Sequence, residues 1–218
     1  MKKKARAAPS KEIRVMVADD HPVVREGLAA LIKSQPDMKL VCEAENGWAA
    51  VQQYLKHRPD VVLLDLRMPE MDGIAATKNI RGKDRKAKVI VLSTYKGDED
   101  VYQALKAGAI SYLLKDCRRE ELVNAIRTVY EEKVEMSPLV ATQLASGVRC
   151  ERLTKREAEI MKLVAAGKSN KEIGTTLGVT EGTIKVHTGH VFKKLGATGR
   201  TEAIRIALER GIIHLSSL

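Results

Sequence analysis

The 218-residue sequence is poor in aromatic residues and in cysteine. Aromatic side chains make up only 3% of the chain, so the core must be built from Val, Ile, Leu and Ala. The three cysteines are widely spaced and include no C-x-x-C pair, which argues against a disulfide framework and favours a reducing cytoplasm. No apolar run approaches the ~20 residues that a membrane span requires. We therefore expect a cytoplasmic protein with no membrane partner.

Positive charge is concentrated at the two ends of the sequence. Residues 1–10 carry four basic and no acidic groups, residues 11–140 carry 21 of each, and residues 141–218 carry 13 basic and seven acidic groups. The basic start leads into no apolar signal core, so we expect residues 1–11 to form a disordered arm. The basic C-terminal third indicates a polyanionic partner for that part of the chain only.

Residues 12–133 alternate short β-branched runs with amphipathic stretches. This alternation predicts an α/β domain of the flavodoxin-like type, with five parallel strands in a doubly wound sheet of order 2-1-3-4-5. We expect Gly82 to end the third helix. The predicted strands are 13–18, 38–44, 61–65, 88–94 and 110–114, and the predicted helices are 23–33, 48–57, 73–81, 98–107 and 117–132.

Residues 134–152 interrupt the alternation with Ser-Pro and Ser-Gly pairs and are interpreted as a linker that contains a short helix. Residues 153–218 predict a small all-α domain instead. Capping boxes begin two helices at Thr154 and Ser169, Gly178 permits a tight turn, and Thr180 can cap a longer helix. A short helix, a glycine-containing turn and a longer helix are typical of a helix-turn-helix.

Polar side chains end four of the five predicted strands: Asp19 and Asp20, Asp65, Ser93 and Lys115. Because parallel strands end at one edge of the sheet, these side chains converge there. Neighbouring carboxylates repel one another unless a cation lies between them, and Mg²⁺ suits such an oxygen-rich site. A carboxylate beside Mg²⁺ can attack phosphorus and form an aspartyl phosphate, with Lys115 and Ser93 stabilising the phosphoryl oxygens. An isolated strand-end aspartate would more often be a plain surface acid.

D-D-H-P at 19–22, V-V-L-L-D-L-R-M-P-E-M-D-G at 61–73 and L-L-K-D at 113–116 resemble the receiver domain of two-component response regulators. The resemblance covers residues 12–133 and implies that Asp65 accepts a phosphoryl group from a histidine kinase. It implies a Mg²⁺ site formed by Asp19, Asp20, Asp65 and the backbone carbonyl of Arg67. It also implies that Ser93 and Tyr112 are switch residues, although spacing alone favours an ordinary core position for Tyr112.

Rival enzyme classes fit these motifs less well. A haloacid-dehalogenase-type phosphatase needs a second aspartate two residues after the nucleophile, where Arg67 stands. A P-loop nucleotidase needs a glycine-rich loop after the first strand, and flavin binding needs a Ser/Thr/Gly phosphate loop there. The first strand is followed instead by Asp19, Asp20 and His21. We therefore expect a protein that is not an enzyme in the usual sense, although it can dephosphorylate itself.

The predicted recognition helix, residues 181–195, places Ile184, Thr188, Val191 and Leu195 on one stripe, which should face the core. The opposite face carries Lys185, Val186, Gly189, His190 and Lys193, with His187 and Lys194 beside them. A helix of this size fits the major groove, where lysine can donate to guanine or to phosphate. The alternative is the charged face of a protein-binding bundle. A metal site at His187 and His190 lacks a further ligand nearby.

L-T-K-R-E-A-E-I through G-K-S-N-K-E-I-G-T-T-L-G-V-T-E-G-T-I-K-V-H resembles the LuxR-type helix-turn-helix of the NarL/FixJ group, over about residues 149–213. The resemblance implies that the last helix supplies a dimer surface. Gly189 departs from the longer, often basic residue expected there. The residues assigned to contacts with double-stranded promoter DNA are Thr183, Lys185, Val186, His187, His190 and Lys193.

The two halves together predict a transcription regulator whose DNA binding depends on phosphorylation of Asp65, and which forms a homodimer when phosphorylated. The alternative is a regulator that ignores phosphorylation and uses its receiver only as a dimerisation platform. Two ways of activation stay open: exposure of a dimer surface, or release of the DNA-binding helix from the receiver.

Overall fold

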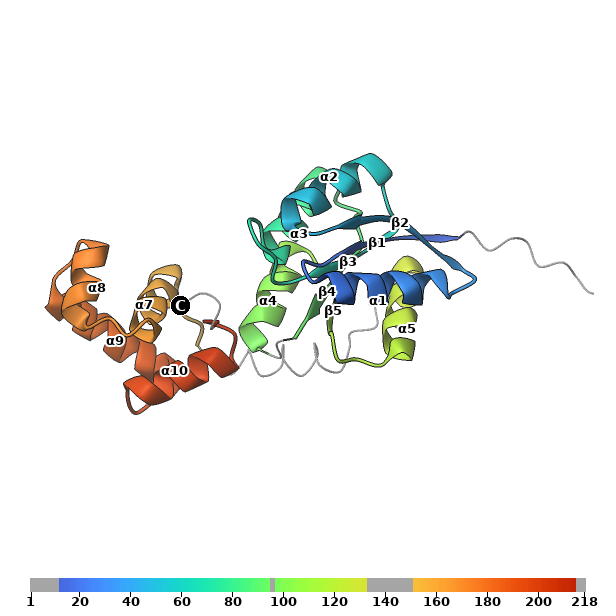
Figure 1. Ribbon diagram of the computed structural model, residues 1–218. Coiled ribbons are helices and arrows are strands. Elements are labelled where there is room, and N and C mark those ends of the chain that lie inside the picture. Colours follow the sequence, from blue (N-terminus) through green and yellow to red (C-terminus); the bar gives the residue numbers. More distant parts are fainter. Residues whose placement is uncertain (1–11, 95–96, 133–150, 215–218) are drawn as a thin grey trace, which may run out of the picture. The chain divides into compact units, whose positions relative to one another are not determined.

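The computed structural model describes residues 12–94, 97–132 and 151–214 (Figure 1). The chain divides into two compact units, residues 1–94 with 104–137 and residues 95–103 with 138–218. The predicted N-terminal arm and the predicted linker helix lie outside the described residues. No helix in the described part is long and apolar enough to cross a membrane.

The first unit is built on a five-stranded parallel sheet with the order β2-β1-β3-β4-β5, as predicted from the sequence. Its central strands are buried along their whole length on both faces of the sheet. Their sequences are therefore nearly continuous runs of Val, Ile and Leu. The strands are β1 (Ile13–Ala18), β2 (Met38–Ala44), β3 (Val61–Asp65), β4 (Val89–Ser93) and β5 (Ser111–Leu114).

Helices cover both faces of this sheet, with α1 and α5 on one face and α2 and α3 on the other (Figure 1). Ile32 of α1 and Ile126 of α5 are buried in one core cluster with β-strand residues such as Val17 and Leu63. The helices along residues 12–132 are α1 (Pro22–Lys33), α2 (Gly47–His57), α3 (Gly73–Lys83), α4 (Asp98–Ala107) and α5 (Arg119–Tyr130), and the first six residues of α4 belong to the second unit.

The prediction that Gly82 ends the third helix, with Arg81 as its last residue, is wrong by two residues. Glycine ends a helix when it takes a positive φ, and Gly82 is not among the positive-φ residues. The helix continues to Lys83 and stops at Asp84, whose backbone N–H donates to the Ile80 carbonyl. The other boundaries differ from the predicted ones by no more than two residues.

The strand register places the ends of β1, β3, β4 and β5 side by side. Ala18 pairs with Leu64, so Asp19 follows β1 next to the end of β3. Asp65 pairs with Leu92, and Ser93 pairs with Leu114. The carboxyl edge of the sheet therefore collects the polar side chains that the sequence assigns to one site.

The second unit contains the predicted helix-turn-helix. Both capping boxes are present, Thr154 with Glu157 and Ser169 with Glu172, and Gly178 has the positive φ that its turn requires. Its helices are α7 (Lys155–Ala165), α8 (Asn170–Leu177), α9 (Glu181–Leu195) and α10 (Arg200–Glu209). The four residues predicted to face the core from α9 are all buried: Ile184, Thr188, Val191 and Leu195.

Candidate functional site

The carboxyl edge of the sheet holds a compact cluster of acids. Asp19 is fully buried and Asp65 is only 3% exposed, whereas Asp20 lies at the rim with 29% of its side chain exposed. One potential ligand atom from each of these three residues and from His21 lies within 4.8 Å of the others. Thus the three carboxylates predicted to form a site do come together.

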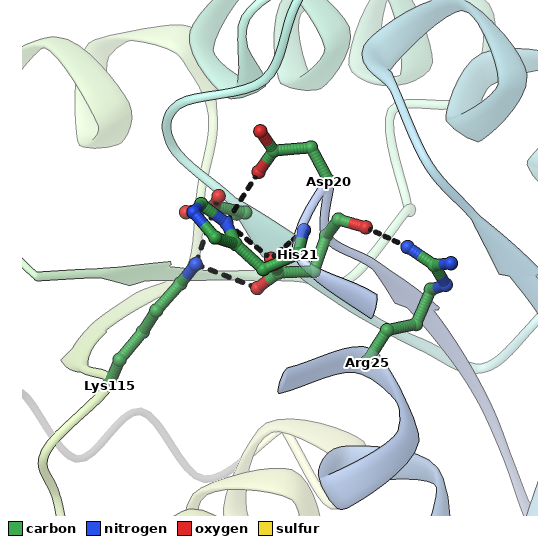
Figure 2. A network of polar contacts seen from close by, with 6 residues as sticks. Asp20, His21, Arg25 and Lys115 are labelled. Atoms are coloured by element: carbon green, nitrogen blue, oxygen red, sulfur yellow. Dashed lines mark hydrogen bonds and ion pairs between the residues drawn. The ribbon is translucent and has the colours of Figure 1, made fainter. Parts of the chain in front are cut away.

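Lys115 supplies the positive charge of the cluster (Figure 2). Its Nζ lies 2.7 Å from Asp19 Oδ2 and 3.0 Å from Asp65 Oδ2. Its backbone N–H donates to the carbonyl of Ser93 at 2.8 Å, which fixes where the side chain leaves β5. Burial opposes ionisation of this amine, but the two carboxylates outweigh it and raise the pKa of Lys115. The ammonium group therefore stays charged.

Asp65 is held in an environment that resists its ionisation. Burial is the main cause, and the nearby charge of Asp19 adds to it, while Lys115 and a backbone hydrogen bond from Arg67 oppose both effects. The balance raises the pKa of Asp65 to about 6. The positive charge of Lys115 thus neutralises only part of the negative charge of the buried carboxylates.

The cluster can accommodate a further cation. Asp19 Oδ2, Asp20 Oδ1 and Asp65 Oδ2 are buried and, among the described residues, accept no hydrogen bond of good geometry. Their partners are ionic: Lys115 for two of them and His21 for Asp20. Carboxylate oxygens with free lone pairs are the donors that Mg²⁺ prefers. The donor set therefore fits a divalent cation at this edge of the sheet.

The backbone around Asp19 is clamped by α1. Arg25 Nη1 donates to the carbonyl oxygen of Asp19 at 2.6 Å, and the His21 N–H donates to Asp19 Oδ1 at 2.9 Å (Figure 2). The sequence-based site did not include Arg25 or His21. His21 directly follows the acid pair, and Arg25 lies one helical turn further on, so their positions in the chain were the only available signal.

The loop after β3 folds back tightly onto the strand. The Leu66 N–H donates to Leu92 and the Leu66 carbonyl accepts from Gly73, both at 2.9 Å. A Cβ atom at Gly73 would lie 2.1 Å from the carbonyl oxygen of Asp65, so this position requires glycine. Arg67 lies within this short loop, two residues past Asp65, at the edge where its carbonyl was predicted to bind Mg²⁺.

Ser93 and Tyr112 are both buried, with exposures of 1% and 0%. Ser93 ends β4 beside Lys115, where its hydroxyl was predicted to meet the phosphoryl group. Tyr112 lies within β5 opposite Val91 and belongs to the buried core. This matches the position that spacing alone predicted for Tyr112, and its proposed switch role stays a prediction.

In the second unit, the outer face of α9 is exposed as predicted. Lys185, Gly189, His190 and Lys193 are exposed, and Val186 keeps 58% of its surface despite being apolar. Thr183 is also exposed and lies at the cap, with its N–H donating to Thr180. His187 is partly buried at the side of this face.

Lys194 has a structural partner. Its Nζ lies 2.8 Å from Glu157 Oε2, and Glu157 is only 6% exposed. Burial raises the pKa of Glu157, but hydrogen bonds from Lys194 and Thr154 outweigh it and hold that pKa below its usual value. The pair joins the start of α7 to the end of α9.

Known proteins share both units. Residues 15–127 match the response regulator receiver domain family, and residues 151–207 match the luxR family of bacterial regulatory proteins. The chain is 42% identical over 210 residues to the transcriptional regulatory protein LiaR of Bacillus subtilis, covering 93% of this chain and all of LiaR. This chain belongs to the NarL/FixJ family of response regulators.

Two further relatives support the assignment. This response regulator is 38% identical to the nitrate/nitrite response regulator protein NarL of Escherichia coli strain K12, over 87% of this chain and 92% of NarL. The crystal structure of the response regulator ChrA from a heme-sensing two-component system aligns with a TM-score of 0.55 at 36% identity, covering 93% of this chain and 99% of ChrA.

Proposed function

We propose that this response regulator accepts a phosphoryl group on Asp65 from a histidine kinase, and that the modification controls binding of the C-terminal unit to double-stranded DNA. The observation that carries the proposal is the buried Asp65 carboxylate at the end of β3, 3.0 Å from Lys115 Nζ. A charged cluster of this kind disfavours folding, so it is better explained by chemistry than by stability.

Asp65 is the nucleophile in this mechanism. One of its carboxylate oxygens forms a bond to phosphorus as the bond between phosphorus and the donor's histidine nitrogen breaks, and the electron pair of that bond leaves with the nitrogen. Lys115 keeps its proton and neutralises a phosphoryl oxygen, and the hydroxyl of Ser93 donates to another. The protein itself carries the phosphoryl group after this step and releases no product made from a substrate. It therefore acts as a signalling protein and not as an ordinary enzyme.

The residues fit a Mg²⁺ ion during this step. Asp19, Asp20, Asp65 and the backbone carbonyl of Arg67 would hold it. The ion would supply positive charge opposite the phosphoryl oxygens and would offset the repulsion among the three carboxylates. The three buried carboxylate oxygens support this assignment, because their ionic partners among the described residues are Lys115 and His21.

DNA recognition is assigned to the exposed face of α9. Lys185 and Lys193 can contact phosphates or guanine, and the exposed Val186 can meet a thymine methyl group. The basic charge of residues 141–218 supports a polyanionic partner. The relative LiaR carries the name of a transcriptional regulatory protein. Phosphorylation would bias the receiver toward a state that forms a homodimer or releases the C-terminal unit.

Acetyl phosphate with Mg²⁺ tests the phosphorylation site. We expect intact-protein mass spectrometry to show one added phosphoryl group on the wild type and none on Asp65→Asn. Asp72→Asn is the matched control, because Asp72 is an exposed cap residue on the same loop and asparagine also caps helices. Equal labelling of Asp65→Asn and the wild type would refute the assignment.

A further inference from the structure

His21 directs its imidazole toward the acid pair (Figure 2). Its Nδ1 lies 2.8 Å from Asp20 Oδ1 and 3.3 Å from Asp19 Oδ1, while 65% of the side chain stays exposed. The backbone contributes to this placement, since the His21 N–H donates to Asp19 Oδ1 at 2.9 Å. A ring nitrogen therefore stands at the open side of the carboxylate cluster.

The spacing of these atoms suits ligands of one cation. Neighbouring ligands of an octahedral ion with bonds of ~2.1 Å lie ~3 Å apart. The separation between His21 Nδ1 and Asp20 Oδ1, 2.8 Å, is close to that value, and Asp20 Oδ1 is one of the three buried oxygens assigned to the cation. With its proton on Nε2, the ring presents the Nδ1 lone pair to the same space as the carboxylate oxygens.

We propose that His21 is a metal-selecting residue, which raises the affinity of this site for late first-row divalent cations such as Co²⁺, Ni²⁺ and Zn²⁺ relative to its affinity for Mg²⁺. The inference deepens the proposed cation site of the receiver and rests on it. Carboxylate, carbonyl and water ligands suit Mg²⁺, whereas imidazole adds affinity for the later metals and little for Mg²⁺. The exposed ring can turn toward an arriving ion without disturbing the core.

The competing explanation is that His21 only hydrogen-bonds the acid pair. In that case its Nδ1 carries the proton and donates to Asp20. The residue then changes the affinity of the site for every divalent cation by a similar factor, through local charge and loop geometry. The two explanations predict different ratios of the Co²⁺ affinity to the Mg²⁺ affinity in a variant without His21. Loss of a nitrogen ligand lowers the affinity for Co²⁺ much more than that for Mg²⁺, whereas loss of a hydrogen bond lowers both alike.

Isothermal titration calorimetry of the full-length protein with Co²⁺ and with Mg²⁺ separates them. In His21→Gln we expect the affinity for Co²⁺ to fall by ~10-fold or more, as for other losses at metal sites, and that for Mg²⁺ by less than ~3-fold. His57→Gln is the matched control, because His57 ends α2 and is not part of the acid cluster. It should bind both ions like the wild type.

Absorption spectroscopy gives a second readout. Co²⁺ bound to the wild type should show a visible band that shifts in His21→Gln, since replacing a nitrogen ligand alters the ligand field. Asp20→Asn should abolish both the tight Co²⁺ binding and the band. Thermal unfolding by circular dichroism should be unchanged in metal-free His21→Gln, which excludes loss of the fold.

Equal effects of His21→Gln on Co²⁺ and Mg²⁺, or no effect on Co²⁺, would overturn the proposal. Tight Co²⁺ binding that survives Asp20→Asn would overturn it too, because the ion would then bind elsewhere, for example at His187 and His190. None of these outcomes touches the phosphorylation of Asp65, which is measured by mass without Co²⁺, so failure of the two proposals can be told apart.

Discussion

The two functional regions of this response regulator use charge in opposite ways. At the sheet edge, Asp19 and Asp65 are at most 3% exposed and share one lysine. On the outer face of α9, Lys185 and Lys193 are exposed, and the neighbouring Val186 is 58% exposed. Buried like charges cost free energy in the folded state, whereas exposed charges cost almost none.

This difference indicates what each region is built to do. Desolvated groups that are only partly compensated are ready to react or to bind a cation, and substitutions there should change stability and reactivity together. Exposed groups on a rigid helix are ready to meet a partner, so substitutions there should change binding and leave the fold intact.

Lys115→Ala should have the largest effect. It removes the only cation that contacts both Asp19 and Asp65 among the described residues. We expect the rate of phosphorylation by acetyl phosphate to fall by about 100-fold or more, as when one preorganised charge donor is lost. Lys83→Ala, on the exposed end of α3, is the control and should react normally. A rate within about threefold of the wild type would mean that Lys115 is structural.

Asp65→Asn should stabilise the receiver when no divalent cation is present. The pKa of Asp65 is raised to about 6, so at pH 7.5 the folded state holds a carboxylate that the unfolded chain ionises more easily. The uncharged amide of asparagine removes the free-energy cost of burying this carboxylate but also loses part of the contact with Lys115. We therefore expect the free energy of unfolding, measured by chemical denaturation, to rise by about 2 kcal/mol. Mg²⁺ should stabilise the wild type and abolish much of the difference. A less stable variant would contradict this account of the cluster.

Glu157→Gln should destabilise the C-terminal unit by about 2 kcal/mol at neutral pH, because it breaks a buried ion pair while keeping the size of the side chain. The folded-state pKa of Glu157 is lowered, so its contribution is complete above the unfolded value and is lost as the pH falls through the folded value. Thermal unfolding should therefore show the wild type and Glu157→Gln converging in acid. Glu159→Gln, which alters an exposed pair with Arg156, should have little effect at either pH.

Gly189→Ala should give the smallest effect, and a favourable one. A Cβ atom at Gly189 would meet nothing within 4 Å, and alanine is preferred over glycine inside a helix. We expect the free energy of unfolding of the C-terminal unit to rise by up to about 1 kcal/mol. Gly178→Ala should do the opposite, because Gly178 has a φ of +67°. A loss of stability in Gly189→Ala would show that α9 needs flexibility at this position.

The sequence predicted the features that follow from periodicity and topology. Parallel strands that end in Asp19, Asp65 and Lys115 must meet at one edge, and an apolar stripe that includes Ile184 and Val191 must face a core. The strand order and the buried stripe are confirmed by the structure. These predictions depend on the backbone alone.

Contacts between side chains that are far apart in the sequence could not be predicted from periodicity and topology. The pairing of Lys194 with Glu157 and the orientation of His21 depend on rotamers and on packing across elements. The clamp of Arg25 on the Asp19 carbonyl arises only once α1 lies against the sheet. Gly82 shows the same limit within a single helix, because a glycine ends a helix only if its backbone takes a positive φ.

The central claim is that Asp65 in the first unit controls DNA binding by the second. The most direct measurement is the affinity of the full-length protein for double-stranded DNA selected from a random pool, with and without acetyl phosphate and Mg²⁺. Phosphorylation should change the wild-type affinity by ~10-fold, a typical coupling between sites, and should leave Asp65→Asn unchanged. Equal affinities of phosphorylated and unphosphorylated wild type would contradict the claim and would favour a receiver that serves only as a dimerisation platform.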